Sequence, residues 1–547
     1  MDLDPALCYR AVLARDARYD GRFFTCVKTT GIYCRPICPA RPPKLANCIF
    51  VPTAAAAQSA GFRPCLRCRP ESSPGVDAWR GTEATVSRAL RLIESGAMDD
   101  GDVAALAERL QIGDRQLRRL FAKHVGAAPI TVAQTRRVLL AKQLIHQTNL
   151  SMIDVAMASG FGSVRRFNET FQQMYARPPR ELRRRASASP APEISLLLPY
   201  RPPYDWDSML RFLSARAIAG LEAVTGGTYS RVVEVGDALG SVSVSHEPDE
   251  SALRVIVRLA DLRVLPAIVA RTRRVFDLSA DPAAIATALS ADPMLQPLLS
   301  VRPGLRVPGG WDGFETAVRA VLGQQITVKG ATQILSRLVA ALGPNLSERI
   351  GRSGLTHAFP RPQAFTPGAL ATLGITRARI TALAGVASAA QRDPNLFEPR
   401  RDLAEAVDRL RELPGIGPWS AHYIAMRALG ECDAFPAGDV GLQRRFALCG
   451  QPCSETALTS HAQRWRPWRA YAAVHLWLSD GDAEPIARGD HSRARSILPP
   501  STGTPGEGWG GGSSRIEKNH GHAQTVSVSS RIHEKNHPKE YPHAVSA

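Results

Sequence analysis

The spacing of apolar residues divides the 547-residue chain into regions with different predicted structures. Helical spacing runs from residue 79 to about 185 and returns beyond residue 301. Between these regions the chain alternates apolar with polar residues, as half-buried antiparallel strands do, in the segments 228–235, 241–246 and 253–259. Helical stretches complete the pattern of an α+β unit near residues 208–219, 262–275 and 282–290.

Linkers and length also favour several domains. Residues 71–75 and 186–192 are short stretches rich in serine and proline. A chain of 547 residues is too long for one core, so three to four domains are the natural expectation. Beyond about residue 492 the sequence is glycine-rich and polar, and we expect this tail to be disordered.

The segment Leu413-Pro-Gly-Ile-Gly-Pro-Trp-Ser420 predicts a tight turn between two helices. Gly415 and Gly417 do not suit a helix interior, yet apolar residues resume helical spacing directly after them. Such a turn presents backbone N–H groups at a helix N-terminus, which favours binding of a phosphate. Asp439 follows at the predicted start of a further helix. A phosphate clamp beside one carboxylate suggests chemistry on a sugar of a nucleic acid.

Charge and composition indicate a polyanionic partner. The formal net charge is +18 and the isoelectric point is near 9.9, which suits nucleic acid and also a membrane surface. No run of 18 apolar residues predicts a membrane span. The N-terminal residues lack the basic and apolar regions of a signal peptide. We therefore expect a cytoplasmic, nucleoid-associated protein without membrane contact.

Four of the ten cysteines have the spacing of a zinc site. Cys34 and Cys38 form one short pair, Cys65 and Cys68 form another, and 26 residues separate the pairs. In a cytoplasmic protein this spacing predicts one Zn²⁺ held by four thiolates. The alternative is four structural or free thiols. Five arginines surround the ligands, and we expect them to offset the charge of the zinc–thiolate centre and to contact phosphates: Arg35, Arg41, Arg63, Arg67 and Arg69.

The sequence around these cysteines resembles the N-terminal domain of the Ada adaptive-response proteins. The resemblance rests on Thr-Thr-Gly-Ile-Tyr-Cys-Arg-Pro at 29–36 and Gly-Phe-Arg-Pro-Cys-Leu-Arg-Cys at 61–68. It implies that Cys34 is both a zinc ligand and the acceptor of a methyl group from a methylphosphotriester in DNA. Methylation would reduce the negative charge of the centre and strengthen DNA binding. Pro39 replaces an arginine of the family pattern. The implied DNA contacts are Thr30, Arg41 and Arg63.

Residues 79–185 contain two helix-turn-helix signatures. Asp114 is expected to cap one helix, and Ser163 to cap another. The pattern of Ala156, Gly160-Phe161, Phe167, Phe171 and Pro178 resembles the AraC-type DNA-binding domains, although Ala176 stands where that family often has glycine. The alternative is an ordinary helical bundle with a basic face. The resemblance implies that two helices read promoter bases, near residues 114–123 and 163–173.

From about residue 198 to 480 the chain resembles the helix–hairpin–helix DNA glycosylases of the AlkA type. Asp439 takes the place of the family's catalytic aspartate, which stabilises an oxocarbenium-like sugar while the N-glycosidic bond is hydrolysed. On its own this residue could be a plain helix N-cap. No lysine lies between Leu413 and Asp439, so we expect a monofunctional enzyme that needs no cofactor. The matching segments are 199–206, 302–309, 413–419 and 467–477.

The same resemblance implies a pocket for the damaged base. An alkylated purine carries positive charge, which aromatic side chains attract by stacking and cation–π contact. Gly415 and Gly417 are implied to hold the DNA backbone. Gln325 takes the position at which the family inserts a leucine into the gap left by a flipped base. The implied pocket residues, each of which could instead belong to the core, are Trp419, Tyr423, Trp477 and Phe212.

These inferences predict a bifunctional protein of the response to DNA alkylation. We expect it to release bases such as 3-methyladenine and 7-methylguanine, to accept methyl groups on Cys34 in a single-use reaction, and to activate repair genes. Its partners would be double-stranded DNA and RNA polymerase, and we expect a monomer. The alternatives are a glycosylase fused to a zinc-stabilised DNA-binding module without methyl transfer, and a pure regulator of transcription. The predicted parts are a zinc α+β domain at 1–75, an all-α double helix-turn-helix domain at 79–185, an α+β glycosylase N-terminal domain at 193–300, an all-α helix–hairpin–helix glycosylase domain at 301–492 and a disordered tail at 493–547.

Overall fold

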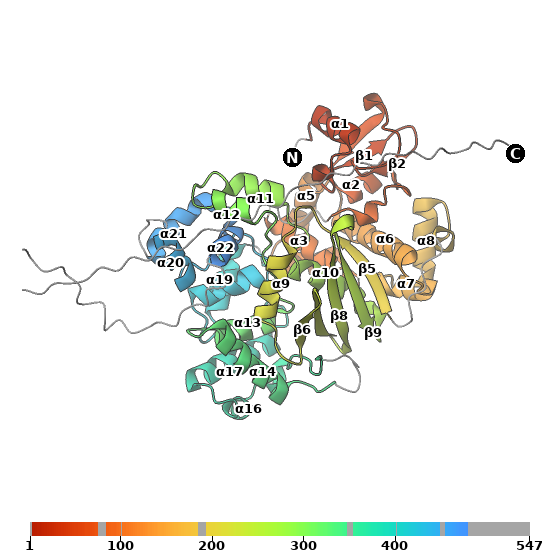
Figure 1. The fold of residues 1–547 in the computed structure, drawn as a ribbon. Helices are drawn as coiled ribbons and strands as arrows, with labels where there is room; N and C mark the ends of the chain where they lie inside the picture. Colours follow the sequence, from red (N-terminus) through yellow and green to blue (C-terminus); the bar gives the residue numbers. More distant parts are fainter. Residues whose placement is uncertain are drawn as a thin grey trace, which may run out of the picture. The chain divides into compact units, whose positions relative to one another are not determined.

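The fold is drawn in Figure 1 from a computed structural model. The predicted tail at 493–547 lies outside the described residues, as do Cys449 and Cys453. None of the helices in the described part of the chain combines the length and apolar character that a bilayer span requires. The residues described are 3–74, 84–99, 101–183, 193–346, 354–400, 402–448 and 454–479.

The N-terminal domain is a small α+β unit. Its four strands are arranged in the order β3-β1-β2-β4. Strand β1 pairs antiparallel with β2 and β3, whereas β2 and β4 are parallel. Thr53 caps α2, whose four alanines are buried. The elements are α1 (Pro5–Ala14), β1 (Phe24–Val27), β2 (Ile32–Cys34), β3 (Cys48–Val51), α2 (Ala54–Ser59) and β4 (Arg63–Pro64).

The next domain is helical, as predicted. Ser163 caps the last long helix through its hydroxyl, which accepts from the backbone N–H of Arg166. The expectation for Asp114 is wrong by one position, because Gly113 is the N-cap and Asp114 is the first residue of the helix. The elements are α3 (Ala84–Glu94), α4 (Val103–Arg109), α5 (Asp114–His124), α6 (Pro129–Gln147), α7 (Met152–Ala158) and α8 (Val164–Tyr175).

A five-stranded antiparallel sheet follows, in the order β5-β9-β8-β7-β6. The three predicted strands correspond to β7, β8 and β9, and the sequence did not reveal β5 and β6. The elements are β5 (Glu193–Pro199), α9 (Trp206–Ala215), β6 (Glu222–Thr225), β7 (Thr228–Val235), β8 (Ala238–Glu247), β9 (Ala252–Leu259), α10 (Leu265–Val275), α11 (Pro282–Leu289) and α12 (Gln296–Val301).

The last described region is all-α and packs around one apolar core. Asp312 caps α13 by accepting from the backbone N–H groups of Phe314 and Glu315. Helix α13 contacts both α17 and α19, which explains why most of its residues are buried. The elements are α13 (Gly313–Leu322), α14 (Val328–Leu342), α16 (Pro367–Ala371), α17 (Arg377–Arg392), α18 (Leu403–Arg411), α19 (Pro418–Arg427), α20 (Val440–Leu448), α21 (Glu455–His461) and α22 (Arg469–Leu478).

Candidate functional site

The four predicted zinc ligands lie together at one edge of the small sheet. Parallel pairing of β2 with β4 puts Tyr33 opposite Pro64, so the cysteines that follow each of them leave the sheet side by side. All four sulfur atoms lie within 4.8 Å of one another. In an ideal tetrahedron with Zn–S bonds of 2.3 Å the sulfurs are about 3.8 Å apart. Four soft thiolates at this spacing fit one Zn²⁺, held by Cys34, Cys38, Cys65 and Cys68.

The two ligand pairs differ in exposure. Cys65 and Cys68 are each 6% exposed, whereas the pair that contains Cys34 is only half-buried. Each buried sulfur also accepts a backbone N–H, from Arg67 at 3.4 Å and from Arg35 at 3.3 Å respectively. These bonds stabilise the negative charge on the buried pair. A reagent from solvent therefore meets the pair that contains Cys34.

The arginines around this centre do not all face solvent. Arg41 and Arg63 are exposed, as is Thr30, so all three implied DNA contacts are accessible. The expectation that Arg35 contacts a phosphate is wrong, because its guanidinium pairs with the carboxylate of Asp20 and its side chain is only 11% exposed. The positive charge of Arg35 is thus neutralised inside the domain and cannot serve a phosphate.

In the all-α region, Asp439 lies between two tryptophans. Its Oδ2 accepts the indole N–H of Trp419 at 3.0 Å, and its Oδ1 accepts the indole N–H of Trp477 at 3.0 Å. Oδ1 also accepts the backbone N–H of Leu442 at 3.0 Å, so Asp439 caps α20 as predicted. Three of the roughly four acceptor positions of the carboxylate are thus occupied, and one position on Oδ2 is left for a reacting group.

The turn between α18 and α19 presents its backbone to solvent, as the glycine pattern predicts. Gly415 has a φ of 76°, and a Cβ there would come within 2.6 Å of the Ala382 side chain. Gly417 is the N-cap of α19 and has open space around the position of a Cβ. Trp419 follows within the first turn of the same helix and donates its indole N–H to Asp439. Trp419 therefore connects the exposed turn at Gly417 to the Asp439 carboxylate.

The predicted pocket aromatics form two groups. Trp419 and Tyr423 stack, with ring centroids 5.2 Å apart and an interplanar angle of 14°. Phe212 on α9 is 7% exposed, and the guanidinium carbons of Arg216 and Arg427 lie 3.8 and 4.7 Å from its ring centroid. The two groups meet through Arg427, whose Nη1 donates to the Tyr423 hydroxyl at 2.6 Å. Phe212 is therefore a covered support for the pocket rather than an open stacking surface.

The sequence did not reveal the arginines that lie next to the Tyr423 and Phe212 rings. Burial favours a raised pKa for Tyr423, but Arg427, Arg216 and Arg319 outweigh it and lower the pKa of this phenol. Arg319 also donates to the carbonyl oxygen of Arg216 at 2.9 Å and so fixes the backbone beside Phe212. Because these contacts join α9, α13 and α19, no local pattern in the sequence could have revealed them.

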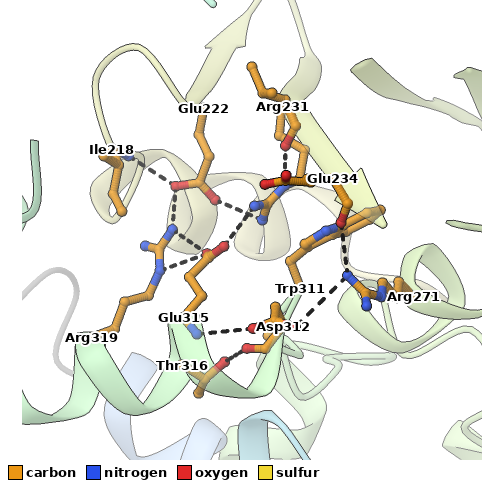
Figure 2. A network of polar contacts seen from close by, with 12 residues as sticks. Ile218, Glu222, Arg231, Glu234, Arg271, Trp311, Asp312, Glu315, Thr316 and Arg319 are labelled. Atoms are coloured by element: carbon orange, nitrogen blue, oxygen red, sulfur yellow. Dashed lines mark hydrogen bonds and ion pairs between the residues drawn. The ribbon is translucent and has the colours of Figure 1, made fainter. Parts of the chain in front are cut away.

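Figure 2 shows the ion-pair network that holds Arg319 in place. Arg319 donates to Glu222 on β6 at 2.7 Å and to Glu315 at 2.8 Å, and Arg231 on β7 donates to Glu315 at 2.8 Å. Burial alone would raise the pKa of Glu315, but the two arginines lower it to about 2. The network therefore joins the sheet to α13 with balanced charges. The i,i+4 spacing of Glu315 and Arg319 was the one part visible in the sequence.

Gln325 lies in the loop between α13 and α14, and its side chain is exposed. Its φ of 58° is unusual for a residue other than glycine. Gln325 is thus on the surface, next to Gln324, whose side-chain amide donates to the carbonyl oxygen of Gly415 in the turn before α19.

Comparisons with known proteins match three parts of the chain. The profile described as the metal-binding domain of Ada matches residues 7–71, a helix-turn-helix domain matches 106–185, and the AlkA N-terminal domain matches 195–312. A probable bifunctional transcriptional activator/DNA repair enzyme AlkA from Mycobacterium tuberculosis is 45% identical over 86% of this chain and 95% of its own length. The chain belongs to this family of bifunctional AlkA proteins.

Two further relatives each cover one part of the bifunctional AlkA chain. DNA-3-methyladenine glycosylase 2 of Escherichia coli is 34% identical over 52% of this chain and 97% of its own length. The bifunctional activator/repair enzyme Ada of the same organism is 39% identical over 22% of this chain and 33% of its own length. The family and the multidomain fold class predicted from the sequence are confirmed, and the four-cysteine centre is a site for one Zn²⁺.

Proposed function

We propose that this bifunctional AlkA protein responds to DNA alkylation with two separate sites, a glycosylase site at Asp439 and a methyl-accepting site at Cys34. The observation that carries the first assignment is the carboxylate of Asp439, fixed by two indole N–H groups beside the exposed turn before α19. The name of the E. coli relative, DNA-3-methyladenine glycosylase 2, supports 3-methyladenine as one substrate.

In the glycosylase reaction, backbone N–H groups at Gly415 and Gly417 hold a phosphate while the damaged nucleotide leaves the duplex. The cationic base lies against the stacked rings of Trp419 and Tyr423, which attract its positive charge. As the glycosidic bond breaks, positive charge moves to the sugar, and Asp439 stabilises it. The free position on Oδ2 then orients the water that completes hydrolysis. No lysine lies between Leu413 and Asp439, so the product is an abasic site in an unbroken strand.

The test is release of free base from alkylated duplex DNA by wild type and by Asp439→Asn. The neutral amide cannot stabilise the sugar cation, and we expect a loss of about a hundredfold or more in rate. Asp433→Asn is the matched control, because Asp433 lies in the same loop but pairs with Arg466 and Arg469. Equal base release by wild type and Asp439→Asn contradicts the assignment.

At the N-terminal centre, the Cys34 sulfur attacks the methyl carbon of a methylphosphotriester. A bond forms between the Cys34 sulfur and the methyl carbon, and the bond between the methyl carbon and the ester oxygen breaks. The oxygen stays on phosphorus, so the leaving group is a phosphodiester anion. Bound Zn²⁺ keeps the thiols deprotonated at neutral pH. The exposed side chains of Thr30, Arg41 and Arg63 hold the neighbouring DNA backbone. Because nothing in the reaction removes the methyl group, each molecule reacts once.

Peptide mass spectrometry after incubation with methylated DNA tests this step. We expect one methyl group on Cys34 and none on Cys48, a half-buried thiol outside the zinc cluster. Unmethylated DNA is the control. A protein that binds the methylated duplex but carries no adduct on Cys34 is a zinc-stabilised DNA-binding module instead.

We further propose that α5 and α8 read promoter DNA and that the protein activates transcription as a monomer with RNA polymerase, on the nucleoid. Both helices carry exposed arginines, among them Arg115, Arg119 and Arg166. Footprinting of a repair-gene promoter before and after methylation of Cys34 tests the link. Tighter promoter binding by the methylated protein is expected, and equal binding contradicts the switch.

A further inference from the structure

Gly441 lies beside the carboxylate of Asp439. It is the second residue of α20, two positions after Asp439. Its φ lies outside the left-handed region, so the backbone at this position suits any residue. Glycine makes a helix less stable than alanine does. The helix thus keeps a residue that weakens it, at a position whose backbone does not require glycine.

The surroundings of Gly441 account for the absence of a side chain. A Cβ at this position would lie 3.1 Å from Oδ1 of Asp439, which is closer than ordinary contact, and 3.9 Å from Cδ1 of Trp477. Within the indole, Cδ1 is bonded to Nε1, and Nε1 donates its proton to the same Oδ1 at 3.0 Å. A side chain at residue 441 would therefore press on the acceptor of this hydrogen bond and lie next to its donor.

The carboxylate cannot move away from such a side chain without disturbing its other contacts. Oδ1 also accepts the backbone N–H of Leu442 at 3.0 Å, and Oδ2 accepts the indole N–H of Trp419 at 3.0 Å. Because a carboxylate is planar, a rotation that moves Oδ1 also moves Oδ2. Oδ2 is the oxygen with an acceptor position left for a reacting group. Crowding at residue 441 would thus change the direction of that free position.

We propose that Gly441 is a positioning residue for base release, because the space that it leaves beside Oδ1 keeps the Asp439 carboxylate aligned with the indole N–H of Trp477. The inference rests on the proposed glycosylase function, since it concerns the carboxylate assigned to that reaction. Gly441 acts through Asp439 and not on the substrate. The smallest addition that tests it is one methyl group, in Gly441→Ala.

The hydrogen bond itself can be observed by nuclear magnetic resonance of the full-length, deuterated protein. The chain has 8 tryptophans, so the indole N–H region is simple, and the signal that disappears in Trp477→Phe belongs to Trp477. We expect Gly441→Ala to move this signal upfield, because the bond to the carboxylate weakens. Gly438→Ala is the matched control. Gly438 directly precedes Asp439, but a Cβ there would meet the carboxylate of Glu455 at 3.5 Å, an ordinary contact.

Single-turnover release of base from alkylated duplex DNA measures the consequence for the reaction. We expect Gly441→Ala to lower the maximal rate about three- to tenfold, because catalytic groups tolerate displacements of only a fraction of an ångström. The protein concentration that gives half the maximal rate should not change. In a Trp477→Phe background the same substitution should cost less than about twofold, since the bond that it disturbs is already absent.

An unchanged Trp477 signal in Gly441→Ala overturns the proposal. So does a higher half-saturating concentration with an unchanged maximal rate, which a side chain that merely excludes the base would cause, or a full loss of rate in the Trp477→Phe background. The proposed glycosylase function is judged separately, by base release in wild type and Asp439→Asn. The indole signal does not depend on base release, so failure of the catalytic assignment and failure of this inference give different results.

Discussion

The zinc centre and the proposed glycosylase site both hold negative charge, but they hold it in different ways. Around Cys34, four sulfur atoms within 4.8 Å of one another share a single cation. At Asp439 the charge is stabilised by neutral hydrogen-bond donors, the indole N–H groups of Trp419 and Trp477. In the proposed reactions, the zinc-bound thiolate is a nucleophile that methyl transfer consumes, whereas the oriented carboxylate is unchanged after each turnover. The chemistry of each site thus follows from its neighbours.

The largest expected effect is loss of the zinc centre, which should unfold the N-terminal domain and leave the glycosylase region intact. Cys68→Ser removes a buried zinc ligand, and structural zinc contributes on the order of 10 kcal/mol to small domains. We expect residues 3–74 to lose zinc and structure while residues 193–479 keep both structure and base release. Zinc content and hydrogen exchange measure the outcome. Cys26→Ser is the control, because Cys26 is buried outside the cluster. A Cys68→Ser protein that retains stoichiometric zinc would contradict this account.

The reverse experiment disturbs only the glycosylase region. The folded pKa of Glu315 is about 2, below its usual 4.5, so its ionised form stabilises the fold above about pH 4.5. This stability is lost as pH falls towards about 2. Glu315→Gln leaves Arg231 and Arg319 underpaired, and we expect it to cost about 3 kcal/mol at pH 7.

Thermal unfolding at neutral and acid pH measures this effect. The difference between Glu315→Gln and wild type should shrink as the pH is lowered. Glu250→Gln, at an exposed position, should unfold like wild type at both pH values. If Glu315→Gln unfolds like wild type at pH 7, the network does not stabilise the fold.

A third substitution tests how the carboxylate of Asp439 is held. Trp477→Phe keeps an aromatic ring but removes one indole N–H from the carboxylate, and a hydrogen bond to a charged group contributes about 1.5–3 kcal/mol. We expect kcat/KM for base release to fall about tenfold or more.

Trp465→Phe is the matched control for that loss. Trp465 donates its indole N–H to Asp292 at 2.6 Å and is fully buried. Its substitution should therefore lower Tm, while kcat/KM for base release by the folded protein should change little. If both variants lower turnover equally, the loss at Trp477 reflects general damage to the fold.

The smallest effect concerns the helix-turn-helix domain. Ala176 ends α8 with a φ of 53°, the left-handed conformation that favours glycine. Ala176→Gly should raise the free energy of unfolding by about 0.5–1 kcal/mol. Ala156→Gly, in the interior of α7, should lower it by a similar amount. Denaturant unfolding measures both, and a destabilised Ala176→Gly would contradict the left-handed conformation.

Local sequence patterns predicted the structural features that depend on residues close together in the chain. The spacing of the cysteines predicted the zinc ligands, the alternation of apolar and polar residues predicted β7 to β9, and Ser163 was correctly identified as a helix cap. The glycine turn before α19 also followed from its residues. Strand β6 was missed because it has only four residues, 222–225, too few to show alternation.

Long-range contacts could not be predicted in this way. Arg35 carries a charge that suits DNA, but its partner Asp20 lies 15 residues away and turns it inward. The resemblance implied that Phe212 lines the base pocket, but the guanidinium of Arg427 covers its ring. These two residues are more than 200 positions apart in the sequence. Such pairings depend on how helices pack, which the spacing of apolar residues does not encode.

The most direct test of the two-site account measures both products on one sample of alkylated duplex. Free base and the methyl adduct on Cys34 are quantified for wild type, Asp439→Asn and Cys34→Ser. We predict that Asp439→Asn loses free base but keeps the adduct, whereas Cys34→Ser loses the adduct but keeps multiple turnovers of base release. Free base at the wild-type rate from Asp439→Asn would contradict the account.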